Sequence, residues 1–467
     1  MVGKRIIEMN YSLKISGIHH TLLINHLFPG DDLEAVALAI CGRHETNSGI
    51  IFLVHEVITV PYSLCAIRTP DRVTWSTEGL SEILQKASRK GLSILKIHSH
   101  PGGFSNFSTI DDQSDKELFT SVFGWFNEDH PHISAVMLPG GEIFGRAILS
   151  DLFFVTLKNI SVAGNNILSW GNAETGIIPD FSLRTRQAFG EGTVNKLKNL
   201  TAVVAGCSGT GSPVIEQLAR LGVGRIILID PDNIEKKNLN RIYNSTMRDA
   251  ILNSKKVGVL KRAIDRIGLG TEVIAFEVNL YDSIEVLMEI ANADVIFGCM
   301  DSVDGRHLLN QVATFYLIPY FDIGIKLISD GKGGIDQIMG TVHYLQPGGS
   351  TLLSRGVYTT EDLRAASIFR KDLNHYMEQK KLGYIADVRV ESPAVISINT
   401  QLASMAVNEF LARIHLYRYD SNDSFAITRV SFTDAYVQYE KDDYSDHYLK
   451  KFIGRGDMRP YLNMPEF

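Results

Sequence analysis

The chain has 467 residues, 45% of them hydrophobic and 21% charged, which is typical of a water-soluble globular protein with two or three domains. Its formal net charge of −7, without a basic run, argues against nucleic acid as the main partner. No apolar stretch reaches the roughly 18 residues that span a bilayer, and the N-terminus lacks a signal-peptide core, so we expect a cytoplasmic protein without membrane contact.

The first 155 residues alternate strand-like runs with one amphipathic helix. The helix is predicted over residues 81–89, where Ile83, Leu84 and Ala87 share one side. Apolar runs of strand length predict four strands, at residues 49–60, 94–100, 133–138 and 142–149. This alternation predicts a mixed α/β domain. The glycine-, asparagine- and serine-rich residues 160–180 that follow are typical of a linker.

Two histidines end the second of these runs. His98 and His100 alternate along a predicted strand, so both imidazoles point to the same face. Ten residues separate His100 from Asp111, enough for a turn that returns the carboxylate to the imidazole pair. Two histidines and one aspartate leave one position of a tetrahedral zinc ion open for water, as in a catalytic site, whereas four protein ligands close a structural site. The alternative is that this His-x-His pair is structural.

The segment HSHPGGFSNFSTID, residues 98–111, resembles the motif of the JAMM/MPN metalloproteases, which cut isopeptide and peptide bonds after ubiquitin-like proteins. The resemblance implies a cytidine-deaminase-like fold with His98, His100 and Asp111 as zinc ligands. It also implies that Ser108 donates a hydrogen bond to the zinc-bound water or to the tetrahedral oxyanion. Zinc in such a site lowers the pKa of its bound water to about 7.

The same family uses an upstream glutamate as general acid and base on the zinc-bound water. Its counterpart here is predicted to be Glu34, which precedes an apolar run that ends at Gly42. Glu45 and Glu56 are the alternatives, and the competing interpretation of Glu34 is a solvated residue in an N-terminal turn. The other histidines of this region are expected to be surface or core residues rather than ligands.

From Leu200 onward, buried strands alternate with helices. Residues 201–206 predict a strand, followed by a glycine-rich turn, a helix over 212–221 and a strand over 225–230, which together form a βαβ unit. Further helices are predicted at 255–267 and 283–291, and further strands at 272–278 and 294–301. This order predicts a doubly wound, Rossmann-like sheet.

The glycine-rich turn contains Gly206, Gly209 and Gly211, and it lies before a helix N-terminus, where backbone N–H groups can reach phosphate. Asp230 ends the next strand, at the position from which a carboxylate binds a ribose hydroxyl. Such a turn is weak evidence by itself, since many doubly wound domains carry one for packing. Up to this point in the chain, a nicotinamide-dependent dehydrogenase fits equally well.

The polar residues that follow do not fit a dehydrogenase. Asn238, Arg241, Lys256 and Asp301 come in this order after the second strand. Arginine and lysine could grip a triphosphate while an aspartate holds magnesium, a clamp that a redox dinucleotide does not need. For each of these residues alone, a surface salt bridge is the alternative interpretation. Two other charged residues are expected to be structural, Asp232 and Arg306.

This set resembles the ThiF/MoeB family of ubiquitin-activating-type adenylyltransferases, whose motifs come in the same order over residues 180–330. Ser208 departs from the family, which normally has glycine there. The resemblance implies a homodimer in which Arg184 reaches the nucleotide of the partner subunit, with Arg186 as the alternative.

By the same resemblance, the chain uses ATP and Mg²⁺. The implied chemistry is attack of a protein's C-terminal carboxylate on the α-phosphate of ATP, with pyrophosphate as the leaving group. The implied roles are a nucleotide turn from Gly206, Gly209 and Gly211, a ribose contact from Asp230, phosphate contacts from Asn238, Arg241 and Lys256, and a magnesium ligand in Asp301.

Many members of this family form a thioester on a cysteine beyond the nucleotide-binding region and hold a zinc ion there with two CxxC pairs. No cysteine follows Cys299 in this chain, so we expect neither feature. The enzyme would then stop at the adenylate, pass it directly to an acceptor or use a hydroxyl. All four cysteines are predicted to be reduced and buried, namely Cys41, Cys65, Cys207 and Cys299. Three hydroxyls lie in the corresponding region, those of Ser350, Thr351 and Ser354.

An amphipathic helix is predicted over residues 392–414, and a strand within 424–432 precedes an acidic, tyrosine-rich tail. The expected fold class is α/β throughout. The expected domains are a mixed α/β JAMM/MPN domain at 1–158, a linker at 159–180, a Rossmann-like ThiF-type domain at 181–415, and a C-terminal strand and tail at 416–467.

Together these resemblances predict a bifunctional enzyme of a bacterial ubiquitin-like protein system, in which a zinc-dependent (iso)peptidase and an ATP-dependent adenylyltransferase act on the same C-terminal tail. The expected partners are a ubiquitin-like or sulfur-carrier-like protein, a conjugating enzyme and a second copy of the chain. One alternative is an adenylating enzyme of sulfur-carrier or peptide-modifying biosynthesis. Another is a non-catalytic scaffold that binds a ubiquitin-like tail.

Overall fold

The computed structural model describes residues 9–46, 49–77, 79–171, 179–330, 332–382, 394–443 and 446–456. The chain folds into two compact units. The first contains residues 1–172 together with the short segments 315–317 and 451–459, and the second contains the rest of the chain. Within the described ranges, every helix is too short or too polar to cross a membrane.

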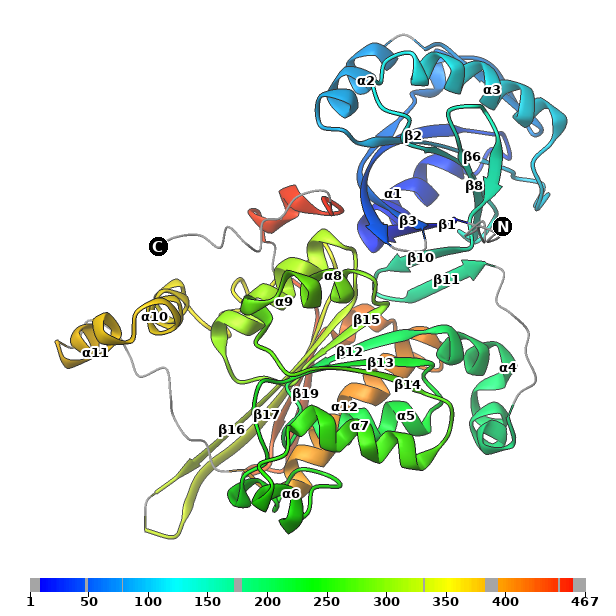
Figure 1. Ribbon diagram of the computed structural model, residues 1–467. Helices are drawn as coiled ribbons and strands as arrows, with labels where there is room; N and C mark the ends of the chain where they lie inside the picture. Colours follow the sequence, from blue (N-terminus) through cyan, green and yellow to red (C-terminus); the bar gives the residue numbers. More distant parts are fainter. Residues whose placement is uncertain are drawn as a thin grey trace, which may run out of the picture. The chain divides into compact units, whose positions relative to one another are not determined.

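The first unit is built on a nine-stranded sheet with the strand order β11-β10-β1-β3-β2-β6-β7-β8-β9 (Figure 1). Its strands are β1 (Asn10–Ser16), β2 (Val36–Thr46), β3 (Gly49–Thr59), β6 (Ser93–Ser99), β7 (His132–Met137), β8 (Ile143–Ile148), β9 (Phe154–Thr156), β10 (Asn159–Ala163) and β11 (Ile167–Gly171). A separate hairpin pairs β4 (Cys65–Thr69) with β5 (Arg72–Trp75). The four strands predicted from the sequence are confirmed as β3, β6, β7 and β8.

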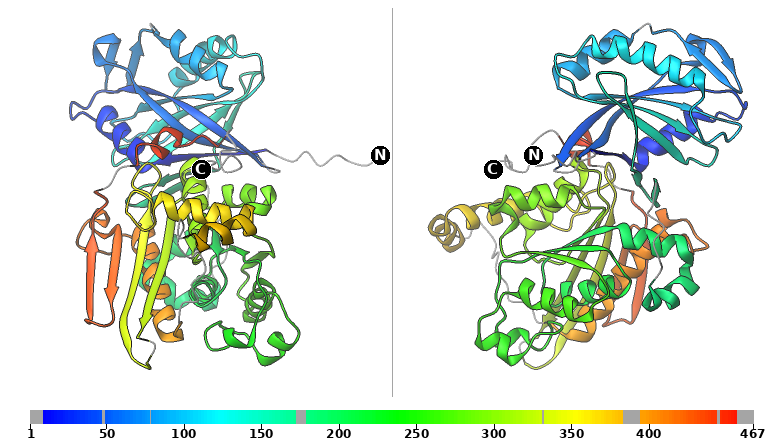
Figure 2. Two further views of the ribbon diagram at one scale, coloured as in Figure 1. Left: turned by 90° about the vertical axis from the view of Figure 1, so that its left-hand side faces the viewer. Right: turned by 45° about the vertical axis from the view of Figure 1, so that its right-hand side comes forward.

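Helices cover both faces of this sheet. α1 (Gly17–Leu27) packs on one face, whereas α2 (Leu80–Arg89) and α3 (Thr109–Phe123) pack on the other (Figure 2). The sequence predicts α2 alone. In α3 polar side chains dominate, so Phe119 and Val122 are too few to give a clear helical period. The capping box of Ser108 and Asp111 is the local signal that marks the start of this helix.

The stretch expected to be a linker contains two strands of the sheet. β10 pairs in parallel with β1, and β11 pairs antiparallel with β10. Ile160 and Val162 are buried because alternate side chains of β10 face the core. The glycine and asparagine residues around these strands hide that alternation in the sequence. Residues 172–178 of the expected linker lie outside the described residues.

The second unit is built on an eight-stranded sheet with the strand order β14-β13-β12-β15-β16-β17-β18-β19. Its strands are β12 (Thr201–Ala205), β13 (Arg225–Ile229), β14 (Glu272–Phe276), β15 (Val295–Gly298), β16 (Tyr320–Ser329), β17 (Ile335–Leu345), β18 (Ile427–Ser431) and β19 (Tyr436–Glu440). The first five strands of the order are parallel neighbours. The predicted doubly wound arrangement is therefore confirmed for this part of the chain.

The helices of the second unit are α4 (Leu183–Asn199), α5 (Gly211–Arg220), α6 (Met247–Ile251), α7 (Lys256–Ile267), α8 (Ile284–Ala291), α9 (Val303–Phe315), α10 (Thr360–Lys371), α11 (Leu373–Lys381) and α12 (Ile396–Ile414). From β12 the chain builds outward to β13 and β14, then returns to place β15 on the other side of β12. The strand order thus reverses between β12 and β15, and open α/β sheets bind ligands at the carboxyl ends of such strands.

An antiparallel extension completes this sheet. The long hairpin of β16 and β17 lies beside β18 and β19, which Figure 2 shows in yellow and orange. The sequence predicts β18 and misses β19, whose side chains are exposed or half-buried and so carry no hydrophobic alternation. Residues 392 and 393 of the predicted long helix lie outside the described residues, and the rest of its length contains α12.

Candidate metal centre and nucleotide site

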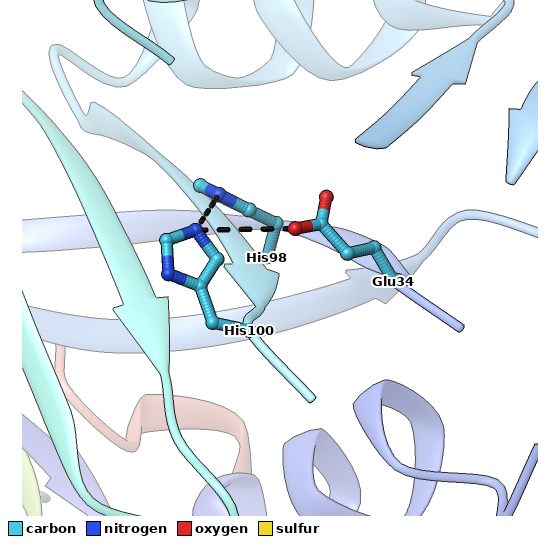
Figure 3. A group of neighbouring side chains, drawn as sticks. All are labelled: Glu34, His98 and His100. Carbon is cyan, nitrogen blue, oxygen red and sulfur yellow. Dashed lines mark hydrogen bonds and ion pairs between the residues drawn. The ribbon is translucent and has the colours of Figure 1, made fainter. Parts of the chain in front are cut away.

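Three buried side chains of the first unit point toward one another: Glu34, His98 and His100 (Figure 3). The Nε2 atoms of the two histidines lie 3.1 Å apart, and the Glu34 Oε1 atom lies 4.0 Å from Nε2 of His100. One ligand atom from each residue falls within 4.8 Å of the others. This group could hold a metal ion.

The β2–β6 pairing explains why these residues meet. His98 lies opposite Val36 in the antiparallel ladder, so the segment that enters β2 runs alongside the end of β6. Ser99 continues the connection, because its Oγ atom accepts a hydrogen bond from the Ala35 N–H group at 2.9 Å, and its N–H group donates to the Ala35 carbonyl at 3.0 Å. Glu34 is thereby brought to the histidine end of β6.

Asp111 approaches both histidines from the first turn of α3. Its Oδ1 atom lies 2.9 Å from Nε2 of His98, and its Oδ2 atom lies 3.6 Å from Nε2 of His100. The Ser108 hydroxyl donates to Asp111 Oδ2 at 2.7 Å and also accepts the Asp111 N–H group as the helix cap. The structure therefore brings together the four residues predicted as ligands and acid/base, with Ser108 bonded to one of them.

The hydrogen bond of His100 and the spacing of the two imidazoles fit a zinc ion. The Nδ1 atom of His100 donates to the Phe104 carbonyl at 2.7 Å, which leaves a lone pair on Nε2 for a metal. The Nδ1 atom of His98 is buried without a hydrogen-bond partner. Zn–N bonds of about 2.0–2.1 Å in a tetrahedron place two nitrogens roughly 3.3 Å apart, close to the observed 3.1 Å. Two imidazoles and carboxylates are also a donor set that zinc prefers.

Burial shifts the protonation equilibria of these groups. It raises the pKa of Glu34 to about 7 and lowers the pKa of His98 to about 4. Burial alone would raise the pKa of Asp111, but hydrogen bonds from His100 and His98 bring it below its ordinary value. At neutral pH, His98 is therefore uncharged, as a metal ligand must be, and Glu34 is poised to take and return a proton.

A hairpin that the sequence does not predict holds the backbone of Glu34. The Arg68 Nε atom donates to the Glu34 carbonyl at 2.9 Å, and the Glu34 N–H group donates to the Thr69 carbonyl at 2.9 Å. Asp31 forms an ion pair with Arg68 on the same loop. The alternatives to Glu34 lie elsewhere: Glu45 is exposed near the end of β2, and Glu56 forms an ion pair with Lys86.

A second group of candidate site residues surrounds the glycine-rich turn after β12. Gly206 has a φ of +91°, and a Cβ atom there would lie 2.6 Å from the Cys299 carbonyl oxygen, so only glycine fits. Gly211 is equally constrained, because a Cβ atom would meet the carbonyl of Gly206. The Asp230 carboxylate accepts the Cys207 N–H group at 2.7 Å and thereby fixes the turn. These contacts join the ends of β12, β13 and β15.

Lys256 lies beside this turn at the start of α7 and is buried. Its Nζ atom lies 2.7 Å from Asp232 and 3.5 Å from Asp230. Burial alone would lower the pKa of Lys256, but these two carboxylates raise it, so the ammonium group stays charged. Asp232, expected to be structural, thus holds a residue predicted to contact phosphate. Arg306, also expected to be structural, forms an ion pair with the buried Asp322.

Arg241 lies against the turn, since its Cδ atom is 3.3 Å from the position of a Cβ atom on Gly209. The amide of Asn399, from α12, crowds the same position and was not predicted from the sequence. The Asn238 side chain accepts the Glu235 N–H group at 2.9 Å, which stabilises the loop that precedes Arg241. Asp301 is exposed in the segment that follows β15.

Arg184 and Arg186 are exposed near the start of α4, and Arg184 donates to Gln187 at 3.0 Å. Their predicted role concerns the nucleotide of a second copy of the chain and stays a prediction.

All four cysteines are free. Cys41, Cys207 and Cys299 are buried, whereas Cys65 is half-buried, which corrects the prediction for that residue. Burial raises the pKa of the Cys207 and Cys299 thiols, so neither is a ready nucleophile. The candidate hydroxyls are engaged: Ser350 accepts from Arg355, Thr351 donates to Asp446, and Ser354 donates to the Thr351 carbonyl.

The turn allows a first prediction. Replacing Gly206 by alanine should destabilise the second unit by at least about 2 kcal/mol, because the left-handed backbone and the Cys299 carbonyl both exclude a Cβ atom. Gly192→Ala in α4 is the control, since a Cβ atom there meets open space. Thermal unfolding checks both variants, and a wild-type unfolding temperature in Gly206→Ala would contradict the constraint.

The ThiF family model matches residues 182–441, which is more than half of the chain. The adenylyltransferase and sulfurtransferase UBA4 of Kluyveromyces lactis is 32% identical over 120 residues, which cover 25% of this chain and 26% of that protein. The tRNA threonylcarbamoyladenosine dehydratase of Bacillus subtilis is 38% identical over 94 residues, covering 20% and 36%.

The matched parts span about a quarter to a third of the length of these curated relatives. Among solved structures, E. coli MccB with ATP is similar with a TM-score of 0.43 and 19% identity, covering 59% of this chain and 74% of that one. Because the family model covers residues 182–441 and the fold of that region is doubly wound, this chain belongs to the ThiF family.

Proposed function

We propose that the second unit binds ATP with Mg²⁺ and adenylates the C-terminal carboxylate of a polypeptide. The observation that carries this proposal is the convergence at the switch point of the sheet. The glycine turn after β12 contacts the Arg241 side chain and is joined to Lys256 through Asp230, and Asp301 follows β15, the strand beside β12. A phosphate-binding turn, two cations and a carboxylate are the groups that phosphoryl transfer requires.

The roles follow from the chemistry of the groups. The carboxylate of the polypeptide attacks the α-phosphate of ATP, and pyrophosphate leaves. Lys256 and Arg241 stabilise the negative charge that develops on the phosphate oxygens, and backbone N–H groups of the turn orient the phosphates. Asp301 would hold Mg²⁺, which would supply further neutralisation of charge.

The burial of Cys41, Cys207 and Cys299 supports an acceptor other than a thioester cysteine of this chain. One relative named above is an adenylyltransferase and sulfurtransferase, which supports a sulfur-carrier-like or ubiquitin-like protein with an extended C-terminal tail as the polypeptide. Peptide modification through the adenylate is the second candidate. The buried cysteines favour it, because such an enzyme needs no thioester.

We infer that the first unit is a zinc-dependent peptidase of the JAMM/MPN type. The convergence of Glu34, His98, His100 and Asp111 in a buried site supports it, together with the raised pKa of Glu34. A bound zinc ion would supply an activated water, and Glu34 is placed to take and return the proton. The peptidase trims a precursor of the polypeptide or removes the polypeptide from a target.

ATP–pyrophosphate exchange tests the adenylation. Candidate small proteins and peptides are offered to the full chain with a free C-terminus, an amidated C-terminus or a C-terminal extension. We expect exchange with one class of free C-terminus and none with its amidated form. Asp301→Ala should abolish this exchange while leaving polypeptide binding measurable. Polypeptide binding without exchange in the wild-type chain would instead identify a non-catalytic scaffold. The class of polypeptide that supports exchange, small protein or peptide, distinguishes activation of a carrier protein from modification of a peptide.

A further inference from the structure

A second buried charge cluster lies behind the candidate metal centre, and the proposed chemistry does not use it. The Lys96 Nζ atom lies 2.8 Å from Asp115 Oδ1, and the Arg146 Nη2 atom lies 2.7 Å from Asp115 Oδ2. The Asp115 side chain is fully buried, and those of Lys96 and Arg146 are 5% and 8% exposed. We name these three residues the charge cluster.

The charge cluster joins the same two elements that carry the histidines and Asp111. Lys96 precedes His98 by two residues on β6, so both side chains project from the same face of the strand. Asp115 follows Asp111 by four residues on α3, so both carboxylates lie on one side of the helix. The Lys96–Asp115 ion pair and the His98–Asp111 contact therefore connect the same strand and helix, two residues apart on β6 and four residues apart on α3.

Arg146 fixes the cluster from a third element, β8. Its guanidinium group lies 3.8 Å from the ring centroids of both Phe107 and Phe154. It also forms an ion pair with Asp112, which neighbours Asp111 on α3. Three ion pairs, Lys96–Asp115, Arg146–Asp115 and Arg146–Asp112, thus determine where the first two turns of α3 lie against the sheet.

The energy of burying charges indicates that this cluster fixes the position of α3 on the sheet rather than adding to the stability of the fold. Burying an ion pair costs desolvation that its attraction seldom exceeds, and apolar residues of similar volume often give equal stability. α3 already packs Phe119 and Val122 into a core with residues of α2. Apolar contacts of this kind tolerate sliding, whereas a hydrogen-bonded ion pair has a defined length and direction. A metal site needs its ligands within about 0.2 Å of their ideal distances.

We propose that the charge cluster is a positioning device that sets the register of α3 on β6 and thereby holds Asp111 against His98 and His100 for metal binding. This inference rests on the proposed metal site of the first unit. Lys96, Asp115 and Arg146 are positioning residues, since they act through the ligands rather than on a substrate.

The test replaces the ion pair by apolar residues in the full chain, with Lys96→Met and Asp115→Leu combined. The matched control is Lys86→Met with Glu56→Leu, which removes an exposed ion pair between α2 and β3. Zn²⁺ affinity is measured by competition with a chromophoric chelator, and Co²⁺ substitution gives the visible spectrum of the site. We expect the double variant to bind Zn²⁺ about 10- to 100-fold more weakly, with a changed Co²⁺ spectrum, and the control to match the wild type.

Lys96→Arg provides a variant that can keep the ion pair, and it should retain wild-type affinity and spectrum. Circular dichroism identifies any variant that fails to fold. If the double variant does not fold, the Zn²⁺ affinities of Lys96→Arg and Lys96→Met are compared instead, and the inference requires the weaker affinity in Lys96→Met. Equal Zn²⁺ affinity and identical Co²⁺ spectra in the cluster variant and the wild type would overturn this inference alone. Failure of the wild-type chain to bind Zn²⁺ would overturn both this inference and the proposed peptidase.

Discussion

Substitution of Lys256 by methionine should reduce ATP–pyrophosphate exchange by about 100- to 1,000-fold, the usual cost of removing a pre-organised group that stabilises transition-state charge. The ammonium group is buried beside the glycine turn and held by Asp230 and Asp232, so it needs little rearrangement to meet a phosphate. Methionine keeps the length of the side chain, and Asp230 keeps its two backbone hydrogen bonds. The second unit should therefore stay folded.

Arg262→Met is the matched control for this experiment. It removes a cation of the same helix, α7, that forms an ion pair with Asp249. The exchange rate of this control should equal that of the wild type, while both variants keep their unfolding temperature within a few degrees. Exchange by Lys256→Met within threefold of the wild type would show that the phosphates bind elsewhere.

The second large effect is expected at Glu34. Glu34→Gln should lower the rate of peptide cleavage by about 100- to 10,000-fold, because an amide cannot accept the proton that general base catalysis transfers. Zinc binding should persist, since His98, His100 and Asp111 remain in place. Cleavage is measured on the polypeptide that supports exchange, fused to a C-terminal reporter, and zinc content by elemental analysis.

The two other glutamates of the sequence analysis supply the controls for that experiment. Glu45→Gln and Glu56→Gln should cleave at the wild-type rate, because Glu45 is exposed and Glu56 pairs with Lys86 away from the histidines. His100→Ala is expected to lose zinc as well as cleavage, which separates the loss of a ligand from the loss of the base. Cleavage that survives Glu34→Gln would place the general base elsewhere.

The sequence predicts the metal centre through one compact motif and one distant residue. His98, His100 and Asp111 could be found because strand alternation and a short spacing bring them together. The precise place of Glu34 depends on the β2–β6 register and on the hairpin contacts of Arg68, a residue 34 positions later in the chain. No local pattern encodes such a contact, since a lone arginine on a short strand resembles any surface residue.

At the candidate nucleotide site, too, some residues can be predicted from local sequence patterns and others are placed only by contacts with distant segments. The glycines after β12 and the alternation of buried strands with helices are local patterns, so the sequence predicts them directly. Asn399 reaches the turn from α12, 190 residues beyond Gly209, and nothing in its own segment marks it as different from any other helix residue. Strand β10 is hard to predict for a related reason, because it pairs with β1 at the start of the chain, and β11 in turn pairs with β10.

The chain enters the first compact unit more than once. Residues 451–456 return to it after the whole second unit has been completed, and there the Ile453 carbonyl bonds His55 while Gly454 packs against the backbone of Val54. A fragment cut after residue 172 would lack this closing segment and leave part of β3 uncovered. The fold of the first unit therefore depends on a segment that the chain supplies only after the second unit, so the two units are not independent along the sequence.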